Sequence, residues 1–195
     1  MTTGRPIQFD PDVALGAAMQ AFWHKGYEAT SLNELLEATR LSKSSLYQAF
    51  GGKQEIFGRC ISRYTDQMVA QLRERLQASE SAVDFIRTTL IDVASEGKRS
   101  DTPQGCLIMN TAAEIGQRDP QFAQWVEHGL ARIRVVFESA VTIGQHSGEL
   151  SLALPAPVVA DYLMSSIAGL RTMVKAGTKP RAVLKIVDVI VSALR

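Results

Sequence analysis

A short helix predicted over residues 43–49 has a polar face that contains no acidic residue. When its residues are placed at about 100° per residue, Leu46 and Phe50 fall on one side and four polar side chains on the other. These four are Lys43, Ser44, Tyr47 and Gln48. An amine, hydroxyls and an amide can donate hydrogen bonds to phosphates and base edges, with no carboxylate to repel them. The face predicts contact with nucleic acid, and an ordinary solvated turn is the alternative.

Two short helices joined by a tight turn would hold this face in place. The sequence SLNE at 31–34 fits a capping box for a helix over 31–38, and Thr30 is the alternative cap. Ser42 is a suitable cap for the helix that follows the turn. Together these signals predict a helix-turn-helix.

Phosphate contacts are expected on both sides of the polar face. Lys53 begins the next predicted helix directly after a glycine pair, and a helix N-terminus offers free N–H groups to an anion. Upstream, Arg5 lies in a short arm of the kind that enters an adjacent minor groove.

Bulk composition sets the limits for this interpretation. The chain has 195 residues, 46% of them hydrophobic, and a net charge of +1, so nucleic-acid binding must depend on a local patch. Its two cysteines, Cys60 and Cys106, lie in no metal-binding or disulfide-framework spacing, and we expect no metal or cofactor. The N-terminus has no signal-peptide core, and no apolar run reaches the roughly 18 residues of a membrane span. We therefore expect a cytoplasmic protein without a membrane partner.

Helical periodicity runs through the chain, and strand signals are nearly absent. Asp-Pro pairs at Asp10 and Asp119 are typical of helix starts, because aspartate caps and proline suits the first turn. The predicted helices are residues 10–25, 31–38, 43–49, 53–77, 81–98, 105–117, 120–146, 156–175 and 180–194. We expect an all-α protein with a small N-terminal module on a larger helical body.

Residues 4–64 resemble the DNA-binding domain of the TetR/AcrR family of transcriptional regulators. The motifs are an apolar helix ending in a phenylalanine and Gly-Tyr (AFWHKGY), a Thr-Ser cap, the helix SKSSLY, and Phe-x-x-Lys before the fourth helix. The chain length and the all-α remainder also fit. The resemblance implies a DNA-binding domain over 1–52, with its helix-turn-helix at 31–50, and an effector-binding and dimerisation domain over 53–195.

The resemblance also implies a role for individual residues, with Ser31 opening the helix-turn-helix. Positions that meet base edges or backbone are Asn33, Lys43, Ser44, Tyr47 and Gln48. Positions that usually hold phosphates are Thr30, Ser45 and Lys53. Arg40 departs from the family pattern, in which glycine is common at the turn, so a left-handed conformation there would be strained.

The last two helices are expected to form a two-fold dimer, as in the family. The final helix is apolar around most of its circumference, and we expect a partner subunit, more than the chain itself, to cover it. The expected interface residues are Leu163, Ile167, Leu170, Val183, Ile186, Val187, Ile190 and Leu194. A dimer would place two recognition helices in successive major grooves of a palindrome.

Aromatic and methionine side chains of the body suit an apolar effector, although each one alone also suits a core position. The candidates are Phe85, Leu90, Cys106, Ile108, Met109, Trp125, Val126, Phe137, Tyr162 and Met164. Cys106 lies in the first turn of a predicted helix, where a thiol is activated, so it is either a sensor or a structural thiol.

The sequence favours a ligand-responsive transcriptional regulator. We expect a repressor that binds palindromic operator DNA as a homodimer and is released by a small apolar or electrophilic effector. The alternative is an all-α small-molecule-binding module or enzyme without DNA function. We expect no enzyme, because the three histidines lack metal-ligand spacing and no phosphate-binding loop or nucleophile elbow occurs.

Overall fold

The computed structural model describes residues 9–99 and 104–195, which form nine α-helices and no strand. The all-α class expected from the sequence is confirmed. The helices are α1 (Pro11–Lys25), α2 (Leu32–Thr39), α3 (Lys43–Phe50), α4 (Lys53–Ala78), α5 (Ala82–Arg99), α6 (Leu107–Glu114), α7 (Pro120–His146), α8 (Ala156–Lys175) and α9 (Pro180–Ser192). The largest difference from the prediction is α6, which is shorter than the expected 105–117.

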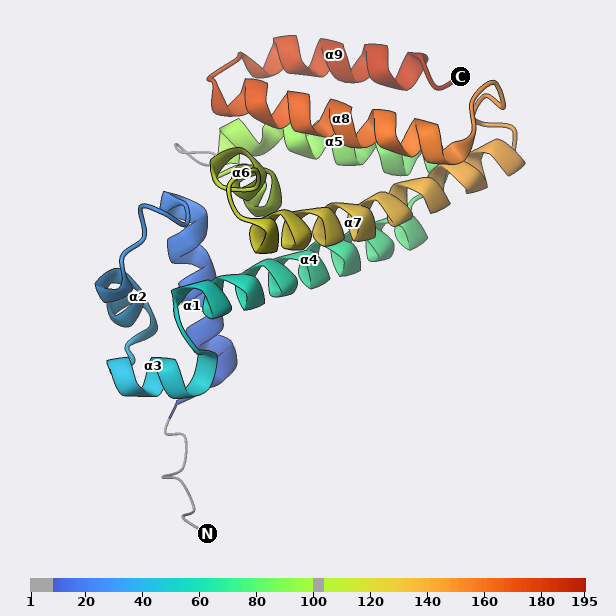
Figure 1. The fold of residues 1–195 in the computed structure, drawn as a ribbon. Coiled ribbons are helices and arrows are strands. Elements are labelled where there is room, and N and C mark those ends of the chain that lie inside the picture. The colour runs from blue at the N-terminus through green and yellow to red at the C-terminus, as the bar shows by residue number, and fades with distance from the viewer. Residues whose placement is uncertain (1–8, 100–103) are drawn as a thin grey trace.

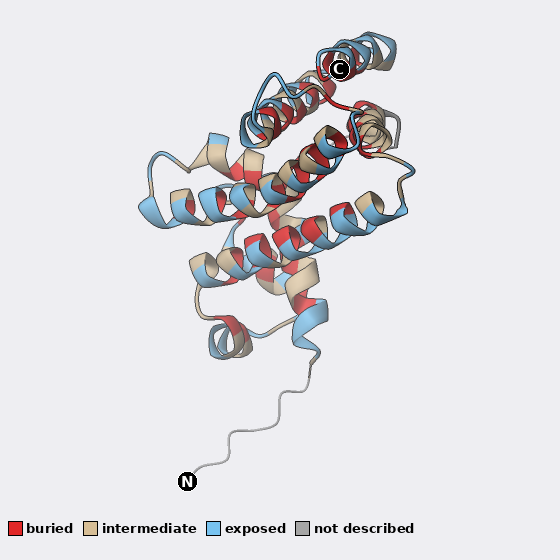
Figure 2. Ribbon diagram, turned by 90° about the vertical axis from the view of Figure 1, so that its right-hand side faces the viewer, coloured by how far each residue is buried: buried red, intermediate tan, exposed pale blue. Residues whose placement is uncertain are grey.

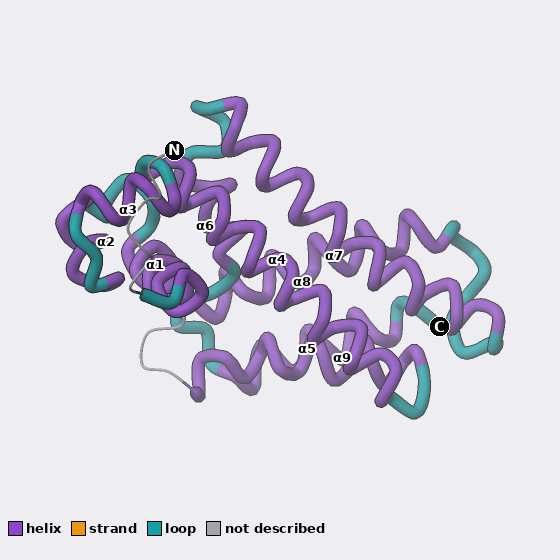
Figure 3. Tube along the Cα trace, turned by 90° about the horizontal axis from the view of Figure 1, so that it is seen from below, coloured by secondary structure: helices purple, strands orange, loops and turns teal. Residues whose placement is uncertain are grey.

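The helices form two regions that α4 connects (Figure 1). Helices α1–α3 make a small unit, here called the head, and α5–α9 make the body. The long helix α4 leaves the head and runs along the body beneath α7, against which it packs extensively. Seen from below in Figure 3, α6 lies on the side of the body that faces the head.

Local capping explains where the main helices begin. The Asp10 carboxylate accepts hydrogen bonds from the N–H groups of Asp12 (2.8 Å) and Val13 (3.4 Å), with proline at the first helical position. At the start of α7, Asp119 accepts a bond from Gln121 N–H at 2.8 Å. Both predicted Asp-Pro starts are therefore confirmed.

An aromatic cluster joins the head to the body. The ring of Phe57, in α4, lies 4.8 Å from Phe22 of the head and 5.5 Å from Phe122 of α7, measured between centroids. Tyr27 completes the cluster, 4.6 Å from Phe122. Figure 2 shows the buried residues running through the facing sides of the helices, and one continuous core includes residues of both regions.

Helices α4 and α7 approach closely because glycines lie at their crossing. A Cβ atom built on Gly58 would lie 2.5 Å from the Trp125 ring. One built on Gly129 would lie 2.9 Å from Ile108 Cδ1 and 3.1 Å from Thr65 Oγ1. Larger residues would push the helices apart at these two positions.

The apolar inner face of the last helix is covered by its own chain. Helix α9 packs mainly on α5 and less on α8. Seven of the eight expected interface residues are buried within the protomer, and Ile186 is half-buried; the seven are Leu163, Ile167, Leu170, Val183, Val187, Ile190 and Leu194. The outer faces of α8 and α9 are exposed instead.

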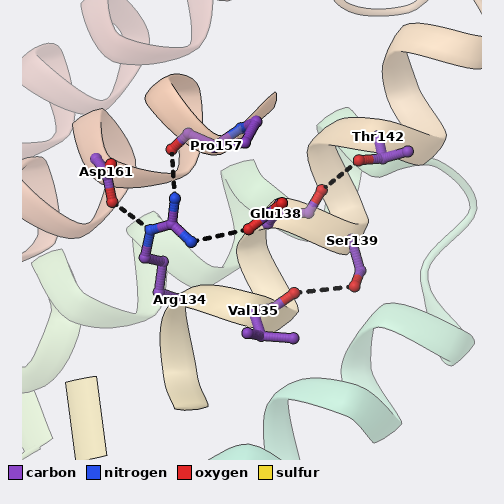
Figure 4. Close-up of polar contacts among 7 residues, drawn as sticks. All are labelled: Arg134, Val135, Glu138, Ser139, Thr142, Pro157 and Asp161. Carbon is purple, nitrogen blue, oxygen red and sulfur yellow. Dashed lines mark hydrogen bonds and ion pairs between the residues drawn. The ribbon is translucent and has the colours of Figure 1, made fainter. Parts of the chain in front are cut away.

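One arginine in the middle of α7 links this helix to the start of α8 (Figure 4). The guanidinium of Arg134 donates to the carboxylate of Asp161, to Glu138 Oε2 at 2.8 Å and to the carbonyl of Pro157 at 3.2 Å. Hydrogen bonding to Asp161 is the main reason that the pKa of Arg134 is raised. Three acceptors on two helices hold the start of α8 against α7.

Candidate nucleic-acid interface

The helix α2 begins at a capping box, as the sequence predicts. Ser31 Oγ accepts a hydrogen bond from Glu34 N–H (3.2 Å), and Glu34 Oε2 accepts one from Ser31 N–H (2.7 Å). Ser31 is the cap, and Thr30 is not. Thr30 is fully buried, and its hydroxyl donates to the carbonyl of Gly26 at 2.6 Å, which leaves no donor for the phosphate role implied for Thr30.

The turn between α2 and α3 contains the strained residue that the sequence suggested. Arg40 has φ 56° and ψ 31°, a left-handed conformation that favours glycine. Its N–H donates to the carbonyl of Glu37 (3.3 Å), and Leu41 N–H donates to Leu36 (3.2 Å), so the helix end is satisfied.

The two faces predicted for α3 are confirmed. Leu46 is fully buried and Phe50 is 3% exposed. The opposite face is exposed, and it consists of Lys43, Ser44, Tyr47 and Gln48. Ser42 Oγ accepts a bond from Ser45 N–H at 3.2 Å and so fixes the start of the helix. An exposed face of donors on a short, capped helix is suited to entering a groove.

The other residues expected to contact DNA differ in their exposure. Asn33 and Ser31 are exposed beside α3, while Ser45 is half-buried and its hydroxyl bonds to that of Ser42 at 2.8 Å. Arg5 lies outside the described residues.

The start of α4 differs from the expected phosphate site. The Gly52 N–H donates to Glu55 Oε2 at 2.8 Å, which places a carboxylate at the helix N-terminus. Lys53 Nζ lies 4.4 Å from the centroid of the Tyr27 ring and 3.4 Å from the carbonyl oxygen of Glu28. Desolvation by burial is the main reason that the pKa of Lys53 is lowered. Lys53 therefore supports the structure of the head in addition to any contact with DNA.

Glu114 of α6 connects the body to the head, and sequence reasoning missed it. Its two carboxylate oxygens accept hydrogen bonds from the N–H groups of Tyr27 (3.0 Å) and Glu28 (2.7 Å). Gly26, at φ 88°, makes room, because a Cβ atom there would lie 2.7 Å from Glu114 Oε2. No local pattern signals a contact between main-chain groups and a residue 86 positions away.

The ten expected effector residues differ in how far they are buried. Six belong to the buried core: Phe85, Leu90, Cys106, Ile108, Val126 and Phe137. Met109, Trp125 and Met164 are half-buried. Tyr162 is 40% exposed on the outer surface of α8 and lines a cavity of about 560 Å³ beside the C-terminus.

Cys106 is the N-cap of α6, 2% exposed, and lies in a cluster of polar side chains. Arg171, from α8, interacts with this thiol and with Tyr64, and it forms an ion pair with Glu96 at 3.1 Å. Burial is the main reason that the pKa of the Tyr64 hydroxyl is raised well above its usual value.

The other cysteine, Cys60, lies outside this cluster of polar side chains. Burial raises the pKa of Cys60 to about 12, which makes Cys60 an inert thiol.

The described ranges contain neither a candidate metal-binding cluster nor a helix that could span a membrane. No three histidine, cysteine or acidic side chains among residues 9–99 and 104–195 group together in a way that would hold a metal ion. In the same ranges no helix combines the length and apolar character needed to cross a membrane.

Both regions match known family models. Residues 14–60 match "Bacterial regulatory proteins, tetR family", and residues 82–190 match "Tetracyclin repressor-like, C-terminal domain". The chain therefore belongs to the tetR family of bacterial regulatory proteins and is a helix-turn-helix transcriptional regulator.

Individual relatives agree with this assignment. The chain is 29% identical over 184 residues to the HTH-type transcriptional repressor ComR of Escherichia coli K12, covering 94% of this chain and 88% of ComR. The structure of the TetR family regulator CifR, bound to 26-base-pair double-strand operator DNA, has a TM-score of 0.85 at 26% identity and covers 98% of this chain and 100% of CifR. Reduced Escherichia coli NemR shares the fold, with a TM-score of 0.81 at 20% identity over 90% of this chain and 93% of NemR.

Proposed function

We propose that the protein is a repressor that binds palindromic operator DNA as a homodimer and leaves it when a small effector occupies the body. The observation that carries this proposal is the exposed, acid-free outer face of α3, held by the caps at Ser31 and Ser42. The repressor name of ComR and the operator DNA bound to CifR support it. We place the division between the DNA-binding and effector domains at residues 52 and 53.

The outer faces of α8 and α9 are the proposed dimer interface. On α8 they present a stripe at helical spacing, formed by Val158, Tyr162, Ser165 and Gly169. On α9 they present Val189, which is 66% exposed. Exposed apolar groups beside small residues allow helices of two protomers to approach closely, and a two-fold dimer presents both α3 helices to one side of the DNA.

The effector is proposed to bind among α4, α5, α6 and α8. Two buried donors lie there: the hydroxyl of Tyr64, which has only the Cys106 thiol as a neighbour, and Nε of Arg171, which has no hydrogen-bond partner among the described residues. Buried donors are usually paired, so a bound molecule with acceptor atoms would satisfy them. A regulator of this kind acts in the cytoplasm and performs no catalysis, and we propose both for this protein.

A mobility shift with the DNA upstream of the protein's own gene tests the proposal. We expect wild type to bind, with affinity that falls steeply as salt rises. Lys43→Ala and Tyr47→Ala should each weaken binding at least about tenfold, because each loses a groove or phosphate contact. Arg73→Ala is the matched control, since Arg73 is an exposed cation on α4. Equal binding by all four proteins would refute the interface.

A second candidate function is an electrophile response through Cys106. It is favoured by the place of the thiol at the start of α6, with Arg171 beside it. Iodoacetamide labelling at pH 7 uses Cys60 as the internal standard, and we expect Cys106 to react first. Equally slow labelling of both thiols would identify Cys106 as a structural residue.

A further inference from the structure

A cavity of about 320 Å³ lies where the head meets the body. Its walls come from four elements: the end of α1 with the residues that follow it, Phe57 of α4, α6, and the last residue of α8. Figure 1 shows α6 next to the C-terminal end of α1. The volume is within the range of small-molecule sites.

One side of this cavity is apolar. Trp23 and Phe57 contribute aromatic rings, and Leu107 contributes an aliphatic side chain from the first turn of α6. The Trp23 ring is held in place, because its Nε1 donates to the carbonyl of Gly105 at 3.2 Å and it makes a T-shaped contact with the Tyr64 ring, with centroids 5.0 Å apart. A fixed aromatic wall favours a flat or aliphatic group.

The other side has a cation without an acidic partner. Lys175 is exposed, and its Nζ lies 3.4 Å from Asn110 Oδ1. Among the described residues no carboxylate lies within ion-pairing distance of this ammonium group. The amide of Asn110 donates to the carbonyl of Gln104 at 2.8 Å and keeps a second N–H for another acceptor.

The other charged side chains of the cavity wall already have hydrogen-bond partners. The ammonium group of Lys25 bonds to Glu34. The Glu114 carboxylate accepts hydrogen bonds from the two main-chain N–H groups of Tyr27 and Glu28. Lys175 is therefore the cation of the wall that is free to bind an anion.

We propose that this cavity binds a small organic carboxylate. The carboxylate bonds to Nζ of Lys175 and the amide of Asn110, and the apolar part of the molecule lies against Trp23, Phe57 and Leu107. A charge-assisted bond at one end and an apolar wall at the other select an amphipathic monoanion over inorganic ions.

Such a ligand would act on the connection between head and body. It contacts α1, α6 and α8 together, and it adjoins the bonds from Glu114 to the head. The ligand would change the affinity for DNA only if it bound more tightly to one arrangement of head and body than to another.

Isothermal titration of the full-length protein with benzoate, and separately with hexanoate, tests the site without DNA. We expect saturable binding of one molecule per protomer. Benzamide, the neutral analogue of benzoate, should bind at least about tenfold more weakly, because it cannot form the charge-assisted bond. This outcome does not depend on whether the protein represses transcription.

Variants locate the site. Lys175→Met should weaken the binding of benzoate at least about tenfold. Lys175→Arg, which keeps the charge, should still bind benzoate. Lys179→Met is the matched control, an exposed lysine four residues further on, and should bind as wild type does. Thermal melting checks that Lys175→Met folds, and Lys175→Gln is the second variant. No saturable binding of either acid, equal binding of benzamide, or unchanged binding by both Lys175→Met and Lys175→Gln would overturn the proposal.

Discussion

The head and the body place their important residues in opposite ways. In the head, the polar side chains of α3 face outward from a helix with only two buried residues, Leu46 and Phe50. In the body, most candidate effector residues face inward and are part of the continuous core. An outward-facing site is defined by local caps and helix periodicity, whereas an inward-facing site depends on packing among distant segments. This difference decides which mutations separate function from stability.

The strongest test of the comparison is Phe57→Ala, because Phe57 is 1% exposed and belongs to the cluster shared by both regions. We expect a loss of about 3–5 kcal/mol of unfolding free energy. Urea unfolding followed by circular dichroism and by tryptophan fluorescence measures it. Phe137→Ala, which removes a ring buried in the body alone, is the control. If the transitions seen by circular dichroism and by fluorescence coincide in both variants, head and body unfold as one cooperative unit. Separate transitions would show that head and body unfold independently.

A smaller effect is expected at the crossing of α4 and α7. Gly129→Ala places a methyl group 2.9 Å from Ile108 Cδ1 and should cost about 1–3 kcal/mol of unfolding free energy through overpacking. Gly16→Ala is the matched change in α1, where the nearest atom lies 4.0 Å away, and it should stabilise by about 0.5–1 kcal/mol. Thermal or urea unfolding compares the two. If Gly129→Ala left the unfolding free energy unchanged, Ile108 and the rest of α6 would move aside easily.

In the head, Arg40→Gly should increase stability by about 0.5–1 kcal/mol, because glycine adopts the left-handed conformation without steric strain. Ala38→Gly, two residues earlier within α2, should instead reduce stability by about 1 kcal/mol. Unfolding in urea measures both changes. A loss of stability in Arg40→Gly would show that the arginine side chain contributes contacts that outweigh its backbone strain.

The smallest expected effect is a pH dependence at Glu34. A hydrogen bond from Lys25, followed by bonds from Ser31, lowers the pKa of Glu34 to about 2 from the ordinary 4.5. Because the folded-state pKa is the lower one, its stabilisation is fully present above pH 4.5 and is lost as the pH falls toward 2. Glu34→Gln should therefore melt below wild type at pH 7 and together with it near pH 2. The same difference in melting temperature between the two proteins at pH 7 and at pH 2 would contradict the lowered pKa of Glu34.

Much of the fold was predictable because its signals are local. The caps at Asp10, Ser31 and Asp119 each satisfy main-chain groups two or three residues away, so a short sequence window contains them. The two faces of α3 follow from helical periodicity alone. The conditional expectation for Arg40, that it is strained if the turn requires a left-handed residue, came from the family pattern of glycine at this turn, and Arg40 has φ 56°.

The remaining features depend on contacts between distant segments. Periodicity shows that α9 is apolar, but it does not distinguish a partner subunit from α5 of the same chain, which covers Val183 and Val187. Tyr162 faces outward because the buried face of α8 is already filled by Leu163 and Ile167. Arg134 links α7 to the start of α8 through groups up to 27 residues away, and no local pattern indicates that contact.

The contact between Glu114 and the head has an evolutionary consequence. The carboxylate oxygens of Glu114 accept hydrogen bonds from the main-chain N–H groups of positions 27 and 28 and not from their side chains. Every residue except proline carries such an N–H group. Those side chains can diverge without removing the contact, provided that position 26 remains glycine. A head with a different DNA preference could thus be exchanged onto this body and still be held in the same place, which allows target choice and effector response to evolve separately.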